Sequence, residues 1–160
     1  MAEKTGGQVS SQKKIKLYLI GSLRNPEVPK MAQEIRELGF DVFDDWYAAG
    51  PEADDKWRDY EKARGHTYRE ALKGLAADHV YQFDLKHLNE CDIAVVCLPA
   101  GKSAHLELGY VIGKGKKGYI LIDNPERWDV MYLFAHGVFH SFEELKRELA
   151  KIKRNKSKQK

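Results

Sequence analysis

A short, strongly apolar run at residues 93–98 (IAVVCL) constrains the fold more than any other stretch of this 160-residue chain. Its β-branched residues and its lack of polar alternation predict a parallel strand that is buried on both faces. Residues 99–101 (PAG) predict a turn, and the apolar residues after them recur at helical spacing. A buried strand that leads through a turn into a helix is the repeating unit of parallel α/β sheets.

Glu107 lies on the face of that helix that is expected to pack against the sheet. We predict that Ser103 is the N-cap of the helix. The stripe facing the sheet then consists of Ala104, Glu107, Leu108, Val111 and Ile112. Burial of an ionised carboxylate without a partner is costly, and ligands of open α/β sheets bind at the carboxyl ends of the strands. Glu107 is therefore the first candidate for a catalytic residue.

The rest of the chain repeats the alternation of strands and helices. We expect strands at residues 15–20, 40–43, 118–122 and 137–140, and helices at residues 27–38, at 78–90 and from a capping box at 141–144 onward. Residues 44–51 are interpreted as a loop, and residues 54–75 as a charged helical excursion weakened at Gly65. The pattern predicts a single three-layer α/β domain with a roughly five-stranded parallel sheet.

Charge is distributed unevenly along the chain. The net charge is +3, but residues 151–160 hold six lysines and arginines and no acid, so removing these six leaves −3 for residues 1–150. We expect a domain at residues 15–150 between a disordered tail at 1–14 and a basic disordered tail at 151–160. RNA contact is the alternative role of the basic tail, although we expect no nucleic-acid partner.

Several kinds of chemistry lack their usual motifs. Cys91 and Cys97 have neither the spacing of a short-loop zinc site nor the number of a disulfide framework. The chain has no paired metal-binding histidines, no phosphate-binding glycine motif and no serine nucleophile elbow. No apolar run approaches the roughly 20 residues of a membrane helix. We expect a cytoplasmic protein without a metal, a cofactor or a membrane partner.

Three further positions remain open from their residues alone. The loop at residues 21–25 (GSLRN) suits a phosphate or carboxylate, through its amides and the side chains of Ser22 and Arg24. It is equally well explained as a strand-to-helix turn. Tyr18 can reach the carboxyl edge of the sheet or be a core tyrosine. Asp84 is either a site residue or an N-cap or solvated acid.

Four stretches carry a resemblance to a known family. They are residues 17–24 (LYLIGSLR), 83–85 (FDL), 92–96 (DIAVV) and 106–110 (LELGY), with a weaker match at 132–138 (YLFAHGV). As a set, they resemble the nucleoside 2′-deoxyribosyltransferase family, which also contains nucleoside 5′-monophosphate N-glycosidases. The resemblance implies a Rossmann-like or flavodoxin-like fold and an enzyme of nucleotide salvage.

The resemblance also implies the roles of individual residues. Glu107 would be the nucleophile of a retaining displacement, Asp84 would bind the base and handle its proton, and Tyr18 would position the nucleophile. The residues expected around the substrate are Gly21, Ser22, Arg24 and Asn25 at a 5′-phosphate, Trp46 and Tyr47 against the nucleobase, and Asp44 or Asp45 at its edge.

Neither branch of the family is matched cleanly. Gly101 stands where the hydrolases have a serine and the transferases an aspartate, and Ser103 is a possible substitute. Tyr132 stands where the transferases have an asparagine, and residues 54–75 depart from both branches. We expect cleavage of the N-glycosidic bond of a deoxynucleoside or its 5′-monophosphate, with transfer to a free nucleobase acceptor. The alternatives are hydrolysis of 5′-monophosphates and a non-catalytic nucleotide sensor. The resemblance further implies a homo-oligomer.

Overall fold

Residues 13–158 are described by the structure, which is a computed structural model. Within them a parallel sheet has the strand order β2-β1-β3-β4-β5. Its strands are β1 (Lys16–Ile20), β2 (Asp41–Phe43), β3 (Ile93–Cys97), β4 (Lys117–Leu121) and β5 (Gly137–Phe139). Each neighbouring pair is parallel. The predicted α/β fold with five parallel strands is confirmed.

β3 occupies the centre of the sheet, as its sequence predicts. All five of its residues are buried, because strands pair with it on both edges and helices cover both of its faces. β1 pairs with it in a register that sets Tyr18 opposite Ala94 and Ile20 opposite Val96.

Helices cover the two faces of the sheet in separate pairs. α1 (Val28–Glu37) and α6 (Phe142–Lys158) pack on one face, where Leu17 and Leu19 of β1 point. α4 (Leu75–Glu90) and α5 (Lys102–Gly113) pack on the other face, where Tyr18 and Ile20 point. Because side chains alternate along a strand, β1 supplies both cores.

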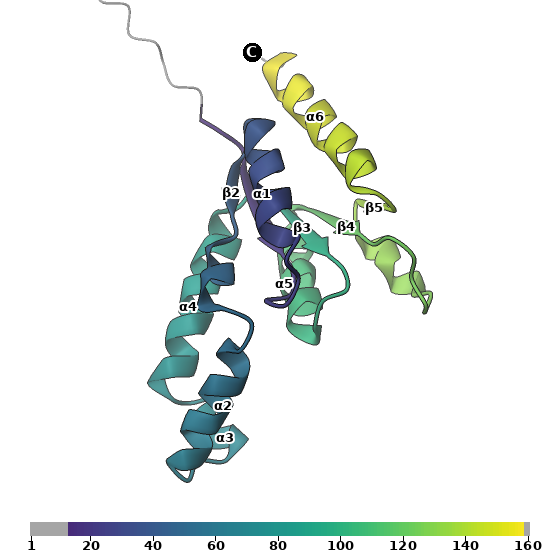
Figure 1. The fold of residues 1–160 in the computed structure, drawn as a ribbon. Coiled ribbons are helices and arrows are strands. Elements are labelled where there is room, and N and C mark those ends of the chain that lie inside the picture. The colour runs from purple at the N-terminus through teal and green to yellow at the C-terminus, as the bar shows by residue number, and fades with distance from the viewer. Residues whose placement is uncertain (1–12, 159–160) are drawn as a thin grey trace, which may run out of the picture.

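The charged excursion is an extension beside the first turns of α4. It consists of α2 (Ala53–Ala63) and α3 (Tyr68–Ala71), which lie away from the sheet in Figure 1. The predicted weak point is confirmed, since α2 ends just before Gly65, whose φ of 78° suits a residue without a side chain. The preceding segment, interpreted as a loop, instead contains a 3₁₀ helix, η1 (Asp45–Ala49). A second one, η2 (Val130–Phe134), precedes β5.

Two predicted caps differ from the structure. Ser103 is not the N-cap of α5: the backbone turns helical after Gly101, and Ser103 lies exposed in the first turn. At the start of α6, Ser141 Oγ accepts a hydrogen bond from the amide of Glu144 at 3.2 Å. The Glu144 carboxylate accepts a hydrogen bond from the amide of His140, whereas in a capping box it would accept one from the amide of Ser141 itself. The capping box is therefore shifted by one residue.

The basic C-terminal segment is helical through Lys158, whereas the sequence suggested a disordered tail. Its attachment to the core explains the difference. Leu149 is buried and Ile152 packs beside it, and the Lys153 ammonium donates a hydrogen bond to the carbonyl of Leu38 at 2.8 Å. Residues 1–12, on which most of the predicted N-terminal tail falls, and residues 159–160 lie outside the described residues.

No helix between residues 13 and 158 is both long enough and apolar enough to cross a membrane.

Candidate active site

Tyr18, Asp84 and Glu107 come together under the α4/α5 face of the sheet, although they are far apart in the sequence. Tyr18 is supplied by β1, Asp84 by α4 and Glu107 by α5. The two carboxyl groups act electrostatically on the tyrosine, and Asp84 acts on Glu107. The fold therefore groups the three residues that the family resemblance singled out.

The environment of Glu107 disfavours its charge. Its neighbours on the inner stripe of α5, Ala104, Leu108 and Val111, are buried. Burial, and then the negative charge of Asp84, raises the pKa of the Glu107 carboxyl to about 7. Among residues 13–158 no hydrogen bond or ion pair holds this carboxylate. Near neutral pH it is thus a partly ionised group that no partner neutralises.

Asp84 is also only partly satisfied. Its Oδ1 atom is buried and has no hydrogen-bond partner. Burial raises the pKa of the carboxyl, while the neighbouring Tyr18 hydroxyl and His87 act in the opposite direction. The alternative interpretation as an N-cap is wrong, because α4 begins at Leu75 and Asp84 lies in its interior. A buried carboxylate oxygen without a partner is unusual unless a ligand uses it.

The Tyr18 hydroxyl is held in its protonated form. Only 1% of the residue is exposed. Burial, followed by the charges of Glu107 and Asp84, raises the pKa of its hydroxyl far above the ordinary value. Phe43 packs against the ring with centroids 4.9 Å apart. The tyrosine is a core residue and a site neighbour at once, so the two interpretations of its sequence position are compatible.

The loop after β1 is shaped by its own polar side chains. Ser22 Oγ accepts a hydrogen bond from the amide of Arg24 at 3.1 Å, and Asn25 Oδ1 accepts one from the amide of Glu27 at 3.0 Å. Gly21 is closely packed, since an added Cβ would lie 3.0 Å from a methyl group of Val28. The loop is therefore a turn that its own side chains stabilise, and Arg24 is its most exposed polar side chain.

Of the aromatic residues predicted at the nucleobase, Trp46 packs against both cores of the sheet, whereas Tyr47 packs against the α1/α6 core. The Trp46 indole nitrogen donates a hydrogen bond to the carbonyl of Leu19 at 2.8 Å, and its ring lies against Gly21. Tyr47 meets this ring edge-on at 5.8 Å. Asp44 is mostly buried and forms an ion pair with Arg36. Its carboxylate, one of the two expected at the edge of the nucleobase, is therefore already engaged.

Gly101 and Ser103 are both exposed where α5 begins. A Cβ on Gly101 would meet only Ser103 Oγ, at 3.9 Å. The position at which both family branches carry a polar side chain is thus open space in this chain.

Two histidines near these residues make contacts that the sequence did not predict. His87 stacks on Phe43 at a centroid distance of 3.8 Å and offsets part of the rise that burial causes in the pKa of Asp84. Its spacing of three residues from Asp84 on a helix was the available signal. His105, interpreted as a rim residue, is exposed, and its Nε2 lies 3.1 Å from the hydroxyl of Tyr132. That contact ties the start of α5 to η2.

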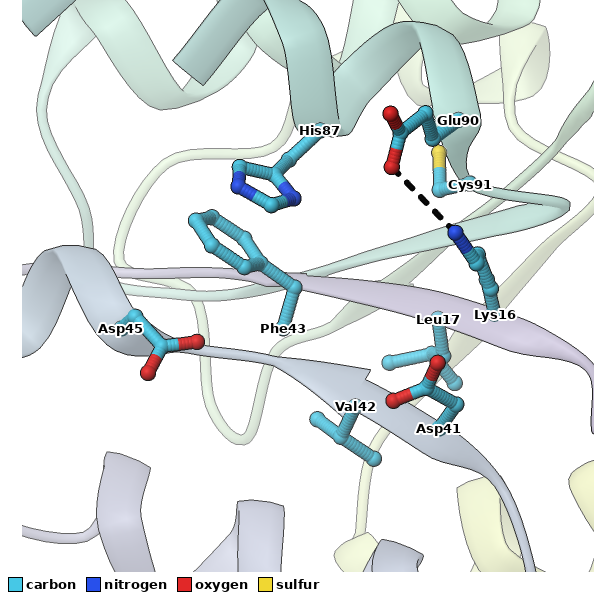
Figure 2. A pocket seen from close by; sticks show the side chains of 9 residues that line it. All are labelled: Lys16, Leu17, Asp41, Val42, Phe43, Asp45, His87, Glu90 and Cys91. Atoms are coloured by element: carbon cyan, nitrogen blue, oxygen red, sulfur yellow. Dashed lines mark hydrogen bonds and ion pairs between the residues drawn. The ribbon is translucent and has the colours of Figure 1, made fainter. Parts of the chain in front are cut away.

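A cavity of about 200 Å³ lies beside this group rather than within it. It runs between the β2 edge of the sheet and α4, as Figure 2 shows. The stacked rings of Phe43 and His87 line one part of it, and the ion pair between Lys16 and Glu90, 3.2 Å long, lines another. Neither Asp84 nor Glu107 lines the cavity. Over the range 13–158 no cluster of side chains suits a metal ion.

Known proteins are similar to this chain in fold. No protein-family model and no curated protein matches the sequence. Among solved structures, a 2-deoxyribosyltransferase from Bacillus psychrosaccharolyticus is 19% identical, with a TM-score of 0.54 over 81% of this chain and 89% of its own. A conserved protein from Enterococcus faecalis V583 is 13% identical, with a TM-score of 0.60 over 87% and 99%. The CMP N-glycosidase BcmB from Clostridium botulinum is 14% identical, with a TM-score of 0.48 over 84% and 97%. The chain thus has the fold of a 2-deoxyribosyltransferase, as its motifs predicted.

Proposed function

We propose that this protein cleaves the N-glycosidic bond of deoxynucleosides and transfers the deoxyribosyl group to another nucleobase, with Glu107 as the nucleophile. One observation carries the proposal: two carboxyl groups and a tyrosine hydroxyl meet on an otherwise apolar face of the sheet, and neither Asp84 Oδ1 nor Glu107 has a hydrogen-bond partner within the described part of the chain. Polar groups left unpaired in this way are candidates for substrate contact.

The first chemical step uses both carboxyl groups. The ionised Glu107 attacks the anomeric carbon, and the bond from that carbon to the base nitrogen breaks. The electron pair of the broken bond stays with the base, which must be protonated to leave. Asp84, whose pKa is raised by burial, is suited to share a proton with the base. The Tyr18 hydroxyl, which remains protonated, orients the carboxyl groups beside it.

The second step regenerates the enzyme. A second nucleobase, or water, attacks the anomeric carbon of the glycosyl ester, passes its proton to the Asp84 carboxylate and releases the Glu107 carboxylate. The acceptor decides between transfer and hydrolysis. Trp46, fixed by its hydrogen bond to Leu19, supplies a rigid ring on which a nucleobase can stack.

Replacement of Glu107 tests the enzymatic role. We expect Glu107→Gln to reduce base release from a panel of deoxynucleosides and their 5′-monophosphates at least about 1,000-fold, because the variant lacks a nucleophile. Base release is measured by chromatography. Glu126→Gln is the matched control, since it removes the same charge from an exposed loop position.

Unchanged release by Glu107→Gln would refute the assignment of the nucleophile. If the wild type binds members of the panel in calorimetry but releases no base, the chain is a nucleotide sensor. The choice between transfer and hydrolysis follows from adding a second free base to the wild-type reaction. A new nucleoside indicates transfer, and free sugar alone indicates hydrolysis.

A homo-oligomer in the cytoplasm is part of the proposal. Large apolar side chains are exposed near η2 and at the start of α4, with Trp128 and Leu75 each 89% and Leu133 84% accessible. A second copy of the chain would cover surface of this kind. Both cysteines are free thiols, which suits a reducing compartment. Light scattering coupled to gel filtration measures the assembly directly.

A further inference from the structure

Asp55, on the charged excursion, holds the arginine of the β1 loop. Arg24 Nη2 donates to Asp55 Oδ2 at 3.0 Å, and Arg24 Nε donates to the carbonyl of Pro51 at 3.4 Å. The other oxygen of the same carboxylate, Oδ1, accepts from Arg58 Nη1 at 2.9 Å. Asp55 thus joins two guanidinium groups, one from the loop and one from its own helix α2.

The charges of this cluster balance. Arg58 also donates through Nε to Asp59 at 2.9 Å, so Arg24 and Arg58 face Asp55 and Asp59. Asp55 lies in the first turn of α2, where the helix dipole favours a negative charge. With two guanidinium groups facing two carboxylates, the cluster has no excess positive charge to offer a phosphate dianion.

The cluster adjoins the loop at the carboxyl end of β1. Arg24 belongs to the loop that leaves the carboxyl end of β1, the strand that carries Tyr18. This is the edge of a parallel sheet at which ligands bind. From there the guanidinium could reach a group on the 5′ carbon, yet Asp55 and Pro51 already engage it from the side of α2.

We infer that Asp55 makes the site selective for nucleosides with a free 5′-hydroxyl over nucleoside 5′-monophosphates; this inference rests on the proposed function. A hydroxyl is neutral, and it can donate to the Asp55 carboxylate and accept from Arg24 without disturbing their ion pair. A phosphate must take the arginine from Asp55 and approach that carboxylate at close range. Like charges so placed repel each other. The excursion at residues 54–75 therefore acts as a specificity element.

The test compares two aspartates on the same helix. Asp55→Asn and Asp59→Asn remove the same charge, but only Asp55 contacts Arg24. We expect Asp55→Asn to raise the ratio of kcat/KM for a 5′-monophosphate to that for its nucleoside about tenfold, a modest factor because the pair is exposed and screened by salt. Asp59→Asn should change the ratio about twofold at most. Thermal unfolding checks that both variants fold.

The outcomes separate this inference from the proposed function. If the wild type cleaves nucleosides and Asp55→Asn leaves the ratio where Asp59→Asn leaves it, the inference is overturned and the proposed function stands. If the wild type cleaves neither substrate, the proposed function fails. Titration with inorganic phosphate then tests whether Asp55 disfavours phosphate binding. Tighter phosphate binding by Asp55→Asn than by the wild type and Asp59→Asn supports the inference, and equal binding overturns it.

Discussion

The two faces of the sheet differ in what they bury. Under α1 and α6 the side chains are almost entirely apolar, including Leu17 and Leu19 from β1 and Leu145 and Leu149 from α6. Under α4 and α5 the same strand contributes Tyr18, and the helices add two carboxylic acids to the apolar residues. One strand therefore serves two environments through the alternation of its side chains.

This difference separates stability from chemistry. The core under α1 and α6 gains from every apolar contact, and the ion pair between Lys146 and Glu34 lies at its partly exposed rim. The α4/α5 face holds Asp84 and Glu107 with raised pKa values, an arrangement that lowers stability when the groups ionise. Such a cost is common where a site must be prepared for a ligand. Substitutions on the two faces should therefore have different consequences.

The largest loss of stability is expected on the apolar face. Leu149 is fully buried, and Leu149→Ala should lower the free energy of unfolding by about 2–5 kcal/mol, through lost burial and the cavity left behind. The kcat/KM of the folded fraction should not change, because Leu149 lies on the other side of the sheet from Glu107. Urea unfolding and kinetics on the same preparation measure both quantities. Impaired kinetics in fully folded protein would show that the faces are not independent.

On the α4/α5 face we expect a smaller loss of stability, accompanied by a loss of activity. A Cβ on Gly118 of β4 would lie 2.6 Å from Ile112 Cγ1 and 2.9 Å from Leu108 Cδ1, both in α5. Gly118→Ala should therefore destabilise the fold by about 1–3 kcal/mol and push α5, with Glu107, away from the sheet.

Gly113, in the same helix, is the control for Gly118→Ala. A Cβ there would meet nothing within 4 Å, so Gly113→Ala should be neutral or slightly stabilising. Base-release assays at full folding distinguish the two variants. If Gly118→Ala is destabilised but fully active, the position of α5 matters less to the site than its packing suggests.

Most of the fold was predictable because its signals are local. The run at residues 93–98 contains its own evidence of burial, and Gly65 marks the break between α2 and α3. The capping of α5 was predicted wrongly because a serine beside a turn looks like an N-cap, whereas backbone geometry started the helix after Gly101. The helical end of α6 depends on contacts of Ile152 and Lys153 with distant residues, which no local pattern reveals.

The candidate site was predictable only in part. The apolar stripe around Glu107 made that carboxylate conspicuous, but nothing local distinguished Asp84 from a solvated acid. Its unpaired Oδ1 appears only when α4 packs on the sheet. The contacts of Arg24 with Asp55 and of Asp44 with Arg36 likewise join side chains from separate elements. Such pairings depend on the tertiary structure, so the sequence contains no local signal for them.

Loss of the Glu107 charge should stabilise the protein at high pH. The pKa of this carboxyl is raised from 4.5 to about 7 in the fold, so between these values the unfolded chain ionises first, and rising pH lowers the free energy of unfolding. Glutamine does not titrate. The advantage of Glu107→Gln should be near zero below pH 4.5 and up to about 3 kcal/mol at pH 8, because each unit of pKa shift corresponds to about 1.4 kcal/mol. Denaturation across this pH range measures it, and a constant difference would contradict the assigned burial.

The smallest effect expected is on the titration of Glu107 itself. Because the charge of Asp84 is the second cause of the raised pKa, after burial, Asp84→Asn should lower the pKa of Glu107 below about 7 but leave it above its ordinary value of 4.5. NMR titration of the Glu107 carboxyl measures this without relying on activity. Asp78→Asn, an exposed change on the same helix, should leave the pKa unchanged. If both variants titrate like the wild type, Asp84 and Glu107 do not interact, and the α4/α5 face holds two isolated acids instead of one site.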